Sequence, residues 1–119
     1  MSKPLMILVA GPYRSGTNGD PALVQANMDA MTRVALDLYR RGHLPVLGEW
    51  FALPLMKEAL RRDPADDADA EIFHPVAERL LARCDACLRI GGPSEGADRM
   101  VATAERLGKP VYRDIGEIP

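Results

Sequence analysis

Residues 5–10 read LMILVA, and residues 11–19, which follow directly, read GPYRSGTNG. An uninterrupted apolar run of this length is typical of a strand that is buried on both faces of a parallel sheet. The second stretch is rich in glycine and other turn-forming residues, so it predicts a loop. We therefore expect a buried strand near the start of the chain that opens into a glycine-rich loop.

A long helix is predicted after this loop. Asp20 before Pro21 is typical of an N-cap followed by proline at the first helical position. Apolar residues then recur at spacings of three and four, which predicts one apolar helix face. Arginines at 40 and 41, followed by Gly42, indicate that the helix ends there.

The remaining chain continues to alternate between strand and helix patterns. We expect strands at 44–47, 86–90 and 110–112, and helices at about 49–62, 73–84 and 96–107. Residues 63–71 contain five carboxylates and one proline and are expected to form a solvated loop. This alternation predicts a single α/β domain over residues 1–119, with a parallel sheet of four or five strands in the order 2-1-3-4.

The predicted strand order also predicts the place of a ligand site. In parallel α/β sheets, ligands bind beyond the carboxyl ends of the strands, where the strand order reverses. Here that point lies between the first and third strands, which lead into the loops at Gly11 and Gly91. Ser94 is expected to cap the next helix, whose N–H groups could hold a phosphate, while an ordinary serine cap is the alternative. Arg14 and Ser15 would add donors from the first loop.

Two residues after the second strand are further site candidates. Trp50 could supply a stacking face, and Glu49 could accept hydrogen bonds from sugar hydroxyls. The alternative interpretation is a surface glutamate and a core tryptophan.

Composition argues against several classes of protein. The net charge of −2, from 15 basic and 17 acidic residues, provides no overall basic field for a nucleic-acid polymer or an anionic membrane. No apolar run reaches the roughly 18 residues of a transmembrane helix. Two cysteines cannot cross-link a domain of this size, so we expect a cytoplasmic protein.

The first loop matches neither the dinucleotide-binding nor the P-loop glycine pattern.

The cysteines and histidines do not form a recognisable reactive site. Cys84 and Cys87 form a CxxC motif that ends a helix, so the helix dipole does not lower the pKa of the thiols. A closed zinc site needs about four ligands, and His43 and His74 lie far apart in the sequence. We expect buried structural cysteines, histidines in loop or cap positions, and neither a metal nor a cofactor.

Short motifs along the chain resemble the nucleoside 2-deoxyribosyltransferase-like superfamily. They are residues 9–13 (VAGPY), Asn27 in the first helix, and residues 84–86 (CDA) in front of residues 94–97 (SEGA). Within that superfamily the chain is most similar to the group called DUF4406, and the similarity spans nearly the whole chain.

The resemblance implies a flavodoxin-like or Rossmann-like three-layer sandwich and a homodimer or larger homo-oligomer. It also implies a pocket for a nucleoside or a nucleoside 5′-monophosphate. Enzymes of the superfamily break or transfer the N-glycosidic bond, using a carboxylate at C1′ as oxocarbenium character develops. By position, the resemblance assigns phosphate binding to Gly11, Tyr13, Arg14, Ser94 and Gly96.

The catalytic glutamate of the superfamily lies six residues after this serine, and that position is Met100 here. On an α-helix Asp98 lies roughly 200° and Glu95 roughly 140° from Met100. Asp98 would also complement the helix dipole. One hypothesis is therefore an N-glycosidase or deoxyribosyltransferase-like activity with a relocated carboxylate, Asp98 first and Glu95 or Glu49 next.

The alternative hypothesis is a nucleotide- or sugar-phosphate-binding module without catalysis, and a third is an oligomerising domain without a ligand. The orientation of Asp98, Glu49 and Met100 discriminates among them. Asp98 and Glu49 in the space between Gly11 and Ser94 would favour catalysis. Asp98 in solvent, with Met100 in that space, would favour binding.

Overall fold

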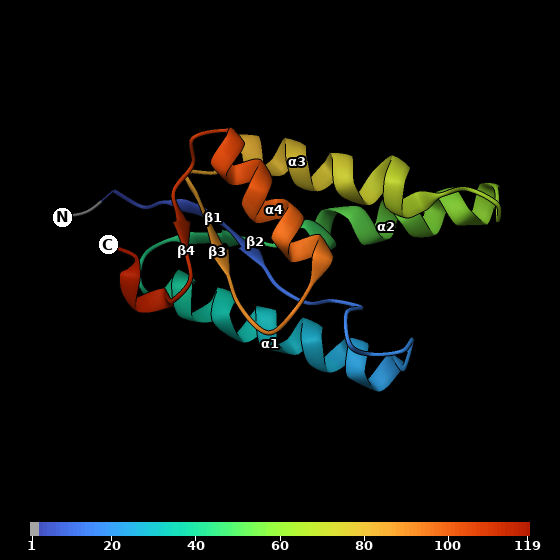
Figure 1. Ribbon diagram of the computed structural model, residues 1–119, viewed down its shortest axis with the longest axis horizontal. Helices are drawn as coiled ribbons and strands as arrows, with labels where there is room; N and C mark the ends of the chain where they lie inside the picture. The colour runs from blue at the N-terminus through green and yellow to red at the C-terminus, as the bar shows by residue number, and fades with distance from the viewer. Residues whose placement is uncertain (1–2) are drawn as a thin grey trace.

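Within residues 3–119, which the computed structural model describes, four strands form one parallel sheet (Figure 1). They are β1 (Met6–Ala10), β2 (Leu44–Val46), β3 (Ala86–Arg89) and β4 (Val111–Tyr112). Their spatial order is β2-β1-β3-β4, and each neighbouring pair is parallel. The predicted α/β class and strand order are thereby confirmed.

The apolar run at the start of the chain forms the central strand. Leu8 of β1 lies opposite Val46 on one side and Cys87 on the other. Ile7, Leu8 and Val9 are at most 2% exposed. The prediction of a strand buried on both faces is correct.

Four α-helices cover the sheet of the described residues. They are α1 (Pro21–Arg40), α2 (Gly48–Arg62), α3 (His74–Arg83) and α4 (Glu95–Arg106). The caps predicted for α1 are present: the Asp20 side chain accepts a hydrogen bond from the Ala22 N–H, and Gly42 has a φ of +97°. None of the helices in residues 3–119 combines the length and apolar character needed to span a membrane.

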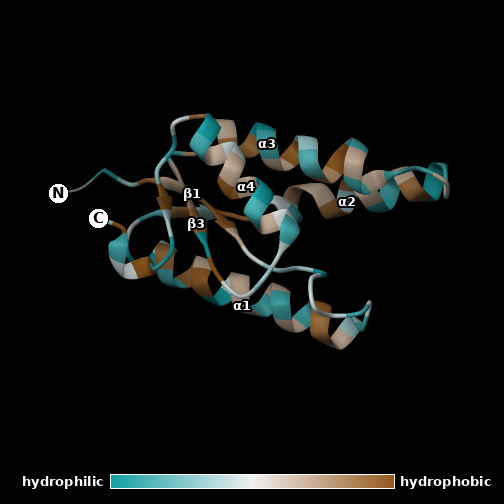
Figure 2. Ribbon diagram, in the orientation of Figure 1, coloured by the Kyte–Doolittle hydropathy of each residue, from teal (hydrophilic) through white to brown (hydrophobic). Residues whose placement is uncertain are grey.

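The two faces of β1 pack against different helices, which gives the sandwich its three layers (Figures 1 and 2). Ile7 and Val9 belong to the core formed with α1, whereas Leu8 belongs to the core formed with α3 and α4. From β1 the chain passes to β2 at one edge of the sheet, and from β2 it returns across β1 to β3 and then to β4 at the other edge. Right-handed crossovers therefore place α1 on one face and the later helices on the other. Figure 2 shows the hydrophobic residues concentrated in the strands and on the helix sides that face them.

The helices α2 and α3 extend past the carboxyl ends of the strands and form an arm with its own small core (Figure 1). This core joins Ala52 and Met56 of α2 to Ala68, with Phe73 packed against it. The loop predicted for residues 63–71 is therefore too long. A π-helical turn, η1 (Asp69–Phe73), starts inside it and leads into α3, because its apolar residues pack against α2.

Candidate functional site

A cavity of about 230 Å³ opens at the carboxyl edge of the sheet, between the first loop, the arm and the start of α4. This is the place predicted from the strand order. Its lining is mostly apolar, with a few polar and charged side chains. The lining residues are Leu8, Val9, Ala10, Gly11, Tyr13, Arg14, Ser15, Gly48, Glu49, Leu53, Met56, Asp69, Phe73, His74, Ala77, Ser94, Gly96, Ala97 and Met100.

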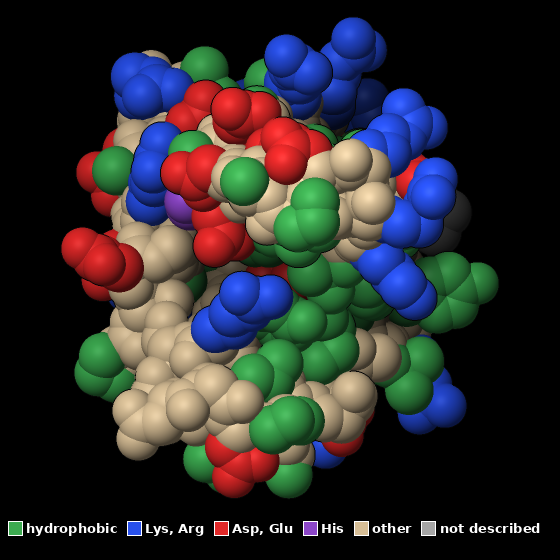
Figure 3. Space-filling view, turned by 90° about the vertical axis from the view of Figure 1, so that its right-hand side faces the viewer, with side chains coloured by type: hydrophobic (Ala, Val, Ile, Leu, Met, Phe, Trp, Pro, Cys, Tyr) green, Lys and Arg blue, Asp and Glu red, His purple; other side chains and the backbone are tan. Residues whose placement is uncertain are grey.

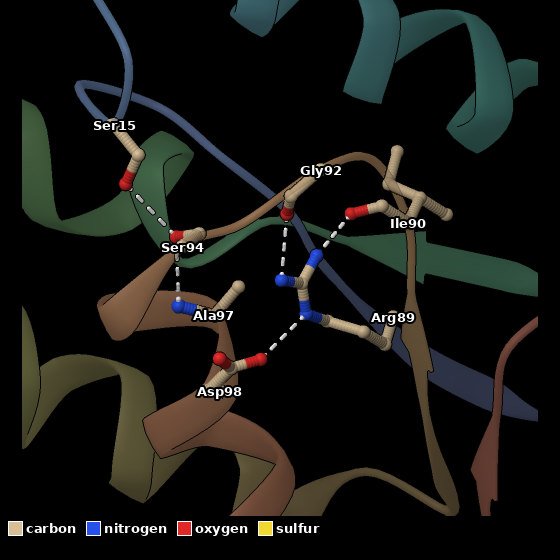
Figure 4. Close-up of polar contacts among 7 residues, drawn as sticks. All are labelled: Ser15, Arg89, Ile90, Gly92, Ser94, Ala97 and Asp98. Atoms are coloured by element: carbon tan, nitrogen blue, oxygen red, sulfur yellow. Dashed lines mark hydrogen bonds and ion pairs between the residues drawn. The ribbon is translucent and has the colours of Figure 1, made fainter.

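The two glycine-rich loops meet at this cavity. The Ser15 hydroxyl lies 3.1 Å from the Ser94 hydroxyl and donates a hydrogen bond to it (Figure 4). Gly91 has a φ of +77°, and a Cβ atom there would lie 2.7 Å from Cδ of Pro12. A Cβ atom on Gly11 would lie 2.9 Å from Cγ1 of Ile90. A side chain at either position would therefore displace Pro12 or Ile90, and the positive φ of Gly91 also favours glycine.

Ser94 caps α4, as predicted, and is itself 7% exposed. Its hydroxyl oxygen accepts a hydrogen bond from the Ala97 N–H at 3.2 Å (Figure 4). The first N–H groups of a helix have no partner inside the helix and form its positive end. Since Gly96 and Ala97 also line the cavity, this positive end borders it.

The first loop is held in place from α1. Nδ2 of Asn27 donates hydrogen bonds to the backbone oxygens of Tyr13 and Ser15, at 2.9 and 3.4 Å. The Arg14 guanidinium carbon lies 5.9 Å from the centre of the Tyr13 ring, a cation–π distance. Arg14 is exposed, so its charge stands at the open side of the cavity.

Arg89 organises the turn that carries Ser94, a role that the sequence analysis missed. Its side chain is 8% exposed and donates hydrogen bonds to the backbone oxygens of Ile90 and Gly92, the latter at 2.8 Å (Figure 4). Its Nε also donates to Asp98 Oδ1 at 3.2 Å. An arginine that ends a buried strand is the signal that could have pointed to this residue.

The three candidate carboxylates lie in different environments. Glu49, in the first turn of α2, is 6% exposed and lines the cavity. Burial raises the pKa of its carboxyl, against a smaller opposing effect of a backbone hydrogen bond. The Asp98 side chain is 68% exposed and pairs with Arg89, and Glu95 is also exposed. Neither Asp98 nor Glu95 lines the cavity, whereas Met100 does.

The structure therefore combines parts of both predicted arrangements. Met100 lines the cavity and Asp98 lies outside it, as expected for a binding module. Glu49 nevertheless lies in the cavity wall, where a carboxylate could act on a bound molecule.

The apolar wall of the cavity comes from the arm and not from Trp50. Trp50 is 44% exposed and is not part of the lining. Leu53, Met56 and Phe73 supply this wall. These three residues could not be recognised from the sequence, because apolar residues at helical spacing are indistinguishable from core residues.

Two polar residues of the arm, Asp69 and His74, also line the cavity and were not selected as site residues. His74 is the first residue of α3, in agreement with the loop or cap position that was predicted for it. His43, by contrast, lies away from the cavity. Its Nδ1 accepts a hydrogen bond from the Leu5 N–H, and its Nε2 lies 3.0 Å from the Pro119 oxygen.

The two cysteines are unpaired and buried, as predicted. The pKa of Cys84 is raised to about 11 and that of Cys87 to about 12, mainly because both thiols are buried. In residues 3–119, no group of three or more His, Cys, Asp or Glu side chains could hold a metal ion.

Comparison with known proteins identified no relative. A scan against protein-family models, and searches of curated proteins and of solved structures, found no match to this chain.

Proposed function

We propose that the cavity binds a nucleoside 5′-monophosphate. The observation that carries this proposal is the meeting of Ser15, Ser94 and the N-terminus of α4 at one side of a largely apolar cavity. Arg14 stands on the same side.

The phosphate would lie between Arg14, the two serine hydroxyls and the first N–H groups of α4. Helix N-termini favour anions because their free N–H groups and dipole both carry positive charge. Arg14 adds a full charge with several donors, and arginine suits phosphate geometry. The short distance between Ser15 and Ser94 indicates that these donors can contact a single anion.

The rest of the nucleotide would extend toward the arm. Leu53, Met56 and Phe73 offer an apolar wall for a planar base, and Phe73 offers an aromatic ring. Glu49, in the first turn of α2, lines the cavity, and its carboxylate could accept hydrogen bonds from sugar hydroxyls. Mostly apolar pockets with a few convergent polar groups are typical of small-molecule sites.

A melting experiment tests this proposal, since a ligand that binds only the folded state raises its stability. We expect 5′-monophosphates to raise the melting temperature well above the effect of the matching nucleosides. Arg14→Gln should weaken monophosphate binding by about tenfold, corresponding to ~1.4 kcal/mol. The control is Arg33→Gln, because Arg33 is an exposed residue of α1 outside the cavity. Equal effects of nucleosides and monophosphates would contradict the assigned phosphate position.

The burial of Glu49 in the cavity wall favours a second candidate function, hydrolysis of the N-glycosidic bond. The ionised Glu49 carboxylate would stabilise positive character at C1′. The bond from C1′ to the base nitrogen breaks, the base leaves with that electron pair, and a water oxygen bonds to C1′. The proton lost by this water balances the negative charge on the departing base.

Release of free base from 5′-monophosphates tests the second candidate. Glu49→Gln should abolish any release by the wild type, and the wild-type rate should rise with pH through the raised pKa of Glu49. Met100→Glu should create or increase the activity, because Met100 lines the cavity at the position where the resemblance expects a carboxylate. Met100→Gln is the uncharged control. Wild-type turnover that survives Glu49→Gln but is lost in Asp98→Ala would place the carboxylate elsewhere.

A further inference from the structure

A second hollow, of about 510 Å³, adjoins the cavity on the side of α1. Tyr13, Arg14 and Leu53 line both spaces, so the cavity and the hollow meet at these three residues. Beyond this boundary, the end of the first loop and the start of α1 form the wall of the hollow. A ligand that fills the cavity can therefore continue past Arg14 into a second space.

One face of the first two turns of α1 provides the apolar wall of the hollow. Pro21, Val24 and Met28 line it at spacings of three and four residues, which place side chains on the same side of a helix. Val24 is half-buried, and among residues 3–119 it is not part of the two cores that cover the sheet. Its side chain is therefore available to a bound molecule.

The polar groups of the hollow suit an uncharged group that is attached to a phosphate. Nε2 of Gln25 donates to Oδ1 of Asp29 at 2.9 Å, which leaves the amide oxygen of Gln25 to accept a hydrogen bond. Among the lining residues that the structure describes, Arg14 alone is charged. Figure 3 shows that the carboxylates of this end of the molecule gather over the end of the arm, above a basic group and a hydrophobic area.

We propose that the hollow binds a second nucleoside, so that the ligand of this protein is a dinucleotide with a pyrophosphate link. The nucleoside monophosphate in the cavity is one half of this ligand. Its phosphate lies at Ser15 and Ser94, and the second phosphate pairs with Arg14, which lines both spaces. The second base packs against Val24 and Met28. This inference rests on the proposed nucleotide-binding function and extends it.

The missing glycine pattern of the first loop agrees with this arrangement. That pattern serves sites in which the pyrophosphate lies at the N-terminus of the helix after the first strand. Here the phosphates lie instead at the N-terminus of α4 and at Arg14, and α1 supplies apolar contacts to the second nucleoside.

Titration calorimetry with AMP, ADP and diadenosine pyrophosphate tests the inference, because these ligands add the second phosphate and the second nucleoside one at a time. Diadenosine pyrophosphate should bind at least about tenfold more tightly than ADP, since it alone fills the hollow. Val24→Glu should reduce this ratio toward unity, because it places a carboxylate in the apolar wall. Leu23→Glu is the matched control and should keep the ratio, because Leu23 is an exposed neighbour that lines neither space.

A measurement on the wild type makes the test independent of how the variants fold. Diadenosine pyrophosphate should shift the backbone amide resonances of Val24, Gln25 and Met28, whereas AMP and ADP should leave them in place. Equal affinities of ADP and diadenosine pyrophosphate, a gain that survives Val24→Glu, or shifts at these residues with AMP would overturn the inference and leave the proposed function standing. A failure of all three ligands to bind would overturn both.

Discussion

At the scale of single residues, a thioether and a carboxylate line the cavity from two different helices. Met100 is 4% exposed and lines the cavity from α4, while Glu49 enters from the first turn of α2. Asp98, the first catalytic candidate in the sequence, instead pairs with Arg89. The helical spacing predicted that Asp98 and Met100 lie on different sides of α4. It did not predict that Asp98 would pair with the buried Arg89.

The buried carboxyl of Glu49 predicts a specific pH dependence of stability. Its pKa is raised in the folded state, so the folded protein binds this proton more tightly than the unfolded chain does. The resulting stabilisation is fully present below the ordinary value of 4.5 and is lost as the pH rises through the raised pKa. Glu49→Gln, which stays neutral, should therefore gain stability relative to the wild type as the pH increases.

Urea unfolding of both proteins between pH 4 and pH 8 measures this difference. Glu95→Gln serves as the control, because an exposed carboxylate should change stability by no more than about 0.5 kcal/mol. A difference between wild type and Glu49→Gln that stays constant with pH would show that Glu49 is not desolvated.

The thiols should react slowly in the folded protein. Cys84 and Cys87 are at most 1% exposed, and their pKa values of about 11 and about 12 leave little thiolate at pH 8. We expect a thiol reagent to label both cysteines rapidly only after denaturation. Fast labelling of the native protein at pH 8 would contradict the buried position of this motif.

At the scale of elements, the contact between the two glycine-rich loops holds the site together. Gly91 lies in a left-handed conformation directly against the Pro12 ring, while a Cβ atom on Gly92 would meet no atom within 4 Å. Gly91→Ala should therefore destabilise the protein by at least about 1 kcal/mol, since L-residues are strained there and the added methyl meets Pro12. Gly92→Ala is the neighbouring control and should change stability much less.

Chemical denaturation measures these two effects, and monophosphate titration adds a functional readout. We expect Gly91→Ala to weaken binding as well, because the turn that presents Ser94 must move. If both variants match the wild type in stability, the close contact between the loops is absent in solution.

Most elements could be predicted from the sequence, because their signals are local. The apolar run of β1, the Asp20–Pro21 start of α1 and the serine cap of α4 each predicted the observed element. The turn η1 could not be predicted in this way. Residues 63–71 are dominated by carboxylates, and the packing of Ile72 and Phe73 against α2, which depends on tertiary structure, determines where the helix begins.

At the scale of the whole molecule, the strand order determines where the cavity lies, and the arm forms one of its walls. The reversal of order between β1 and β3 brings the two glycine-rich loops together, as predicted, and with them Ser15 and Ser94. The arm closes the other side with Leu53, Met56 and Phe73. This wall depends on how α2 and η1 pack beyond the sheet, for which the sequence contains no local signal.

The most direct test of the central claim is to locate a bound nucleotide by following the backbone amide resonances of ¹⁵N-labelled protein during titration with AMP. We predict that the largest shifts occur at Gly11, Ser15, Ser94, Gly96 and Ala97, and that adenosine produces much smaller shifts at these five residues. Shifts confined to residues outside the cavity, or equal shifts with adenosine at the start of α4, would contradict a phosphate site between the two loops.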